Sequence, residues 1–180
     1  MFFDIESKPN FAEDKTHKEV KIDPEVTKQA VEASHEKGSA MVKRLFDKMG
    51  SSKNLSKYSE LIEWGLSQRY GKAKIESIHD ATVKDWEKIS KKPGKNFRNP
   101  AFRFMVNTEG LLEHLGSDLS PQMLKRYNDG QINSFDILKM GLDKMLLEKI
   151  SLSTGKEKIK WKNLEKDFKK IYKEVNDELN

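Results

Sequence analysis

The chain has no cysteine, and this absence removes two kinds of site at once. Without thiols there is no disulfide framework and no thiolate-bound metal, a composition that fits a reducing compartment. The chain also has no apolar run near the roughly 20 residues that a membrane-spanning helix needs. Met1, Phe2 and Phe3 are followed at once by Asp4, whereas a secretory signal continues with basic and apolar regions. We therefore predict a protein without membrane attachment that is not secreted and is cytoplasmic or located within a virus particle.

The sequence also lacks the usual catalytic motifs. Its four histidines are scattered, and neither His35-Glu36 nor Glu113-His114 has the second histidine of a zinc-binding H-E-x-x-H helix. The glycines are spaced as helix ends and form no phosphate-binding loop, and no G-x-S-x-G nucleophile elbow occurs. We therefore predict no catalytic residues, no metal site and no cofactor, and expect that the protein is not an enzyme.

Apolar residues are few for a chain of 180 residues: they make up 36% of it, and charged residues make up 35%. The core must be thin for this length, so much of the chain is solvated surface or meets partners. No segment shows the alternation of a strand, and there is no internal repeat. We predict an all-α fold, an irregular bundle of about seven helices. It has an extended, disorder-prone arm at residues 1–22, a helical domain at 23–150 and a long amphipathic helix at 151–180.

The stretch from Ser120 to Ile150 is the one around which we expect the other helices to pack. Ser120 followed by Pro121 is typical of a helix start, and the turn at 128–130 ends this short helix. Ser134 can cap a second helix, whose apolar residues recur at the spacing of a single buried stripe.

Three other positions give specific expectations about helix boundaries. Gly38 interrupts a helical pattern, so we expect a weak point or a break there. Thr82 with Asp85 three residues later resembles a capping box, which predicts a helix start at Thr82. Residues from Phe102 to Leu115 form a further helical stretch, and the alternative to a single helix is that a second helix begins at Thr108.

Residues 125–136 have the outline of an EF-hand calcium loop. Its first and third positions should supply oxygen ligands but are Lys125 and Tyr127, and the twelfth is Asp136, where calcium loops have a bidentate Glu. We therefore favour a plain helix–glycine turn–helix corner with Ile132 in the core. The same two helices could form a DNA-reading helix-turn-helix, but acids on the second helix would repel phosphates.

A basic segment at residues 88–103 is the first candidate binding site. Residues 67–103 carry six net positive charges, and 88–103 contain no acid. Lysine and arginine bind phosphates, and an interleaved aromatic ring can stack on an unpaired base. The alternatives are a solvated loop with Phe97 and Phe102 turned into the core, or contact with an acidic protein surface. The predicted nucleic-acid or partner-binding residues are Lys88, Lys91, Lys92, Lys95, Phe97, Arg98 and Arg103.

The C-terminal helix is the second candidate. Its apolar residues are spaced alternately by three and four, which gives a narrow apolar side. That side can close the core of its own domain, form a coiled coil with another chain or a second copy, or lie on a membrane; interrupting acids make membrane attachment the least favoured. The predicted interaction helix contains Trp161, Leu164, Phe168, Ile171 and Val175.

Two functional hypotheses follow. The first is a non-enzymatic structural, assembly or adaptor subunit of a larger multiprotein complex, such as a virus particle, with other protein subunits as partners and a homo-oligomer as one form of assembly. The second is a nucleic-acid-binding accessory protein that uses the basic segment 88–103.

Overall fold

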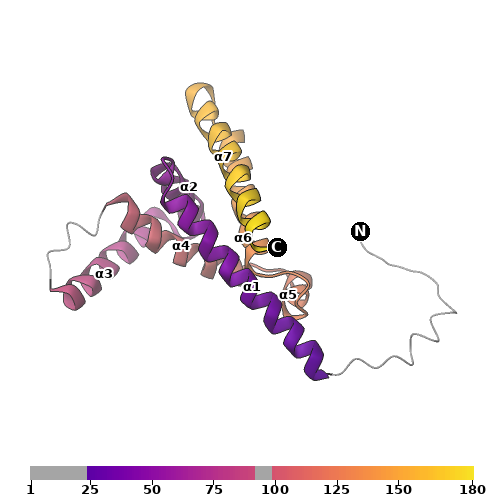
Figure 1. The fold of residues 1–180 in the computed structure, drawn as a ribbon. Coiled ribbons are helices and arrows are strands. Elements are labelled where there is room, and N and C mark those ends of the chain that lie inside the picture. The colour runs from indigo at the N-terminus through magenta and orange to yellow at the C-terminus, as the bar shows by residue number, and fades with distance from the viewer. Residues whose placement is uncertain (1–23, 92–98) are drawn as a thin grey trace.

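The computed structural model describes residues 24–91 and 99–180, which form seven helices and no strand (Figure 1). The predicted all-α fold with a long C-terminal helix is therefore confirmed. The arm predicted at residues 1–22 lies outside the described residues. Within the described ranges, no helix combines the length and the apolar content that crossing a lipid bilayer requires.

The first helix, α1, runs from Pro24 to Gly50 without interruption, so the break expected at Gly38 is wrong. Gly38 is buried where α1 meets the start of the sixth helix. A Cβ atom at this position would lie 2.5 Å from Cβ and Cγ of Asn133. Only a residue without a side chain allows the two helices to approach this closely. This packing requirement outweighs the low helix propensity of glycine.

The second and third helices, α2 (Leu55–Tyr70) and α3 (Lys72–Ser90), follow one another around Gly71, whose φ is 84°. The helix start predicted at Thr82 is wrong, because α3 begins ten residues earlier. The Thr82 hydroxyl donates a hydrogen bond to the Ile78 carbonyl oxygen at 2.8 Å, as threonines inside a helix do.

The fourth helix, α4 (Pro100–Ser117), is capped by Asn99, whose side chain accepts a hydrogen bond from the Phe102 amide. It continues through Thr108, so the alternative restart there is also wrong. The short α5 (Pro121–Asn128) is capped by Ser120 as predicted.

The start of the sixth helix, α6 (Ser134–Ser151), corrects the cap predicted at Ser134. Asn133 is the cap residue, because its side chain accepts from the amides of Phe135 and Asp136. The Asp136 carboxylate in turn accepts from the Asn133 amide, which completes a capping box.

The core is organised around α6, which packs against α1, α2, α4 and α7. Leu138, Leu142 and Leu146 of α6 are almost fully buried in it. The prediction that the whole 120–150 corner is central holds for α6 only, because α5 buries none of its side chains. Helix α3 lies to one side of the molecule (Figure 1). A smaller apolar cluster, Val83, Phe102 and Val106, joins it to the start of α4.

The seventh helix, α7 (Gly155–Leu179), lies against α1 and α6. Its apolar side is completely covered, and Trp161 has no exposed surface. The buried residues of α7 are Trp161, Leu164, Phe168, Ile171 and Val175.

Candidate functional site

The basic segment is only partly within the described residues. Lys88 and Lys91 are exposed at the end of α3, where Lys91 has a left-handed backbone conformation with φ of 58°. Phe102 is 9% exposed, packs in the small cluster with Val83 and Val106 and makes a T-shaped ring contact with Trp86, so it does not present its ring to a base. The remaining predicted contacts, Lys92, Lys95, Phe97 and Arg98, lie outside the described residues.

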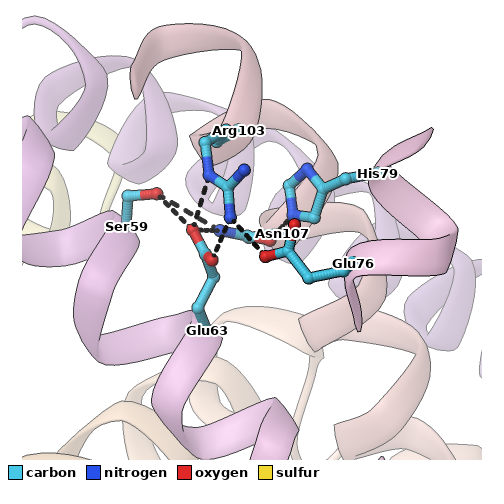
Figure 2. A network of polar contacts seen from close by, with 6 residues as sticks. All are labelled: Ser59, Glu63, Glu76, His79, Arg103 and Asn107. Atoms are coloured by element: carbon cyan, nitrogen blue, oxygen red, sulfur yellow. Dashed lines mark hydrogen bonds and ion pairs between the residues drawn. The ribbon is translucent and has the colours of Figure 1, made fainter. Parts of the chain in front are cut away.

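Arg103, the last residue of the predicted basic site, forms ion pairs within the chain. Its Nη2 atom lies 2.6 Å from Oε1 of Glu63 on α2 and 3.1 Å from Oε1 of Glu76 on α3. Its Nε atom donates to the second oxygen of Glu63 at 3.3 Å. The guanidinium therefore joins three helices, since Arg103 itself belongs to α4 (Figure 2).

A polar network surrounds this arginine (Figure 2). Asn107 donates from Nδ2 to Glu63 at 2.9 Å and to the Ser59 hydroxyl at 3.2 Å. These bonds turn the Asn107 carbonyl oxygen towards His79, which donates from Nε2 at 2.8 Å. Because this oxygen can only accept, Nε2 of His79 must carry the hydrogen of this bond. Asn107 and His79 are each only 2% exposed, so their hydrogen bonds are formed away from water.

Glu63 is the electrostatic centre of the network. Burial acts to raise the pKa of its carboxyl, but hydrogen bonds from Arg103 and Asn107 outweigh burial and lower the pKa below its ordinary value of 4.5. The carboxylate is thus held charged and neutralised by a fixed guanidinium. This closed arrangement is suited to fastening α3 and α4 to α2.

A second polar cluster lies in a cleft of about 600 Å³ between α2, α4, α5 and α6. Asp118 pairs with Arg69, and the Nε2 atom of His114 is 3.7 Å from the same carboxylate. Burial, together with the charges of Arg69 and Lys144, lowers the pKa of His114 although Asp118 acts to raise it. Sequence analysis missed this cluster, because α2 and the end of α4 are more than 40 residues apart and share no motif.

The EF-hand-like turn packs against α1. Tyr127, at the third position of the loop, stacks on His35 with ring centroids 4.3 Å apart. His35 also donates to the Tyr127 carbonyl oxygen at 2.8 Å, and Ser34 donates to the Gly130 carbonyl oxygen at 3.0 Å. Ile132 is buried at 6% exposure. The loop thus forms a helix–turn–helix corner held by α1, as favoured by its sequence. In the part of the chain that the structure describes, no group of three or more metal-ligating side chains is arranged to hold a metal ion.

The structure also bears on the alternatives for α6 and α7. Helix α6 packs against four helices, but Met140 and Leu147 on its outer side are 51% and 60% exposed, so the DNA-reading alternative stays a prediction. The apolar side of α7 is buried within its own chain, so core closure is the alternative that the structure shows for Trp161, Leu164, Phe168, Ile171 and Val175.

An apolar groove of about 550 Å³ opens between α1, α4, α5 and α6. Two of its leucines, Leu112 and Leu124, are 37% and 46% exposed. Polar side chains, including Lys43 and Asp47, also border it. The principal apolar lining residues are Val42, Phe46, Leu112, Leu115, Leu124 and Ile137.

Comparison with known protein families, with curated proteins and with solved structures found no match to this chain.

Proposed function

We propose that this chain is a non-enzymatic assembly or adaptor subunit of a larger multiprotein complex. The observation that carries the proposal is the apolar groove between α1, α4, α5 and α6, with Leu112 and Leu124 at its surface. Contiguous exposed apolar surface rimmed by polar groups is typical of protein–protein contact sites. Pockets of this kind receive the few anchoring side chains that supply most of the binding energy of an interface.

The polar network supports the same proposal. Its charged groups are paired with one another, since Arg103 lies between Glu63 and Glu76. Its histidine and asparagine satisfy each other by a hydrogen bond. The network is therefore suited to a structural role that joins α2, α3 and α4, which supports a function exercised through protein contacts at the groove.

The test places a charge in the groove without removing a buried side chain. Tagged chains that carry Leu112→Glu and Leu124→Glu are expressed in the native source, cross-linked and purified, and the co-purifying proteins are quantified. A charged group in an apolar contact is strongly unfavourable, so we expect at least a tenfold loss of the co-purifying subunit.

The matched control is Leu147→Glu, which adds the same charge at a leucine of α6 that is 60% exposed and does not line the groove. This variant should retain the partner. The proposal is wrong if the wild-type chain is recovered only as a monomer, or if the groove variants and the control retain the partner equally.

A further inference from the structure

Three acids on one flank of α7 contact the rest of the folded chain. Asp167 accepts a hydrogen bond from Tyr58 at 2.5 Å, Glu174 lies 3.5 Å from Lys48, and Glu178 pairs with Arg44 at 3.2 Å. These acids are thereby committed to contacts with α1 and α2.

Five of the eight lysines of α7 project in the opposite direction, whereas Lys160 pairs with Glu60 of α2 at 2.8 Å. At about 100° per residue, five lysines fall within an arc of about 100° that faces away from the buried apolar side. All five are exposed, and the side chains of Lys169 and Lys173 are 68% and 78% exposed. Between Lys162 and Lys173 along the chain no acid falls inside this arc, and Asp177, about one turn later, falls inside it and pairs with Lys173. We call this surface the lysine face of α7: Lys162, Lys166, Lys169, Lys170 and Lys173.

Most of this positive charge is not neutralised locally. Lys173 pairs with Asp177 at the end of the face, and Lys169 lies 4.0 Å from Glu165 at its edge. Among the described residues, Lys162, Lys166 and Lys170 have no ion-pair partner. Five lysines over about 17 Å of helix therefore form a regular row of cations on one rigid element.

The chemistry of the row favours one class of polyanion. A membrane-bound amphipathic helix inserts its apolar side into the lipid, but the apolar side of α7 is already buried in the core. Binding of unpaired bases relies on aromatic stacking, and the one tyrosine of α7, Tyr172, stacks on Phe135. A double helix instead presents a regular row of phosphates, with one charge per about 1.7 Å of its axis.

We propose that the lysine face of α7 binds double-stranded nucleic acid through its phosphate backbone, without reading the base sequence. This site differs from the basic segment 88–103, and it lies apart from the apolar groove, to which α7 contributes no residue. An assembly subunit could thus hold a protein partner at the groove and a duplex at α7 at the same time.

The experiment measures fluorescence anisotropy of a labelled 20-base-pair duplex DNA of mixed sequence with the full chain, between 50 and 200 mM salt. With four to five phosphate contacts, the affinity should fall roughly 150- to 500-fold over this range. The variant Lys162→Gln, Lys166→Gln and Lys170→Gln should bind at least tenfold more weakly at 50 mM salt and should show a smaller salt slope.

The matched control neutralises three exposed lysines of α3 that lie outside the basic segment 88–103, Lys72→Gln, Lys74→Gln and Lys84→Gln, and should bind within about twofold of the wild type. Circular dichroism confirms that each variant is folded. The proposal is overturned if the duplex is not bound at 50 mM salt, or if the α3 variant loses as much affinity as the α7 variant. It is also overturned if polyglutamate of equal charge competes as well as unlabelled duplex, because the surface would then serve an acidic protein.

Discussion

Helices α3 and α7 are both amphipathic, but the rest of the chain covers them to different extents. All five apolar residues on the inner side of α7 are buried. On α3 only Ile75, His79 and Val83 are buried, while Ile89 remains 76% exposed. The buried side of α7 contains Trp161 and Phe168, whereas the buried side of α3 contains His79, which bonds to Asn107.

This difference shows two ways of attaching a helix to the same body. Burial of apolar side chains holds α7 against the rest of the chain. This attachment is spread over many contacts, and its free energy depends little on pH. Polar contacts with fixed partners hold much of α3, so their strength depends on individual groups and on their charge. The three changes below test this contrast.

The largest effect is expected from Trp161→Ala. Trp161 is fully buried, and its indole Nε1 atom donates to Glu157 at 3.2 Å. Replacing a buried tryptophan by alanine leaves a cavity, so the free energy of unfolding should fall by about 3–5 kcal/mol. Urea denaturation measures this loss. Ile159→Ala, at a side chain of α7 that is 60% exposed, is the control and should change stability by less than about 0.5 kcal/mol.

A smaller and more local effect is expected from Arg103→Met. This change removes the guanidinium but keeps much of the apolar stem, which leaves Glu63 half-buried without its cationic partner. Leaving such a group unpaired should lower stability by about 2 kcal/mol. Hydrogen exchange should then become faster in α3 while the amides of α7 are little changed. Equal acceleration in α3 and α7 would contradict a separate polar attachment.

The smallest effect is expected from Glu63→Gln, and it should depend on pH. The pKa of Glu63 is lowered in the folded chain, so its charged form stabilises the fold above about pH 4.5, and this contribution is lost as the pH falls through the lowered pKa. At pH 7 the variant should be about 1–2 kcal/mol less stable than the wild type. Urea denaturation between pH 7 and pH 3 should show this difference shrinking. A difference that stays constant with pH would exclude Glu63 as the group responsible.

The helices themselves were largely predictable. The spacing of apolar residues indicated α7 and its inner side, and Ser120-Pro121 indicated the start of α5. The errors arose where tertiary packing outweighed a local signal. Thr82 has the sequence of a cap but lies inside α3, and Gly38 resembles a helix breaker although Asn133 needs the space beside it.

The candidate sites were predictable only in part. The run of basic residues was visible in the sequence, but the partners of Arg103 are 27 and 40 residues away from it. The same limit applies to Arg69 and His114, which the fold brings into one cleft. Which cations remain available to a partner thus depends on neighbours that no local pattern identifies.

The sequence by itself determined that the chain is helical and which side of α7 turns inward, because both depend on a period of 3.6 residues within one segment. Only the tertiary structure decided how the charges of α7 are used. The same period places three acids of α7 on one flank and five lysines on another, but only the fold brings Arg44, Lys48 and Tyr58 to those acids. Such pairing joins residues that are close in space and distant along the chain, so no local pattern identifies which charges it uses.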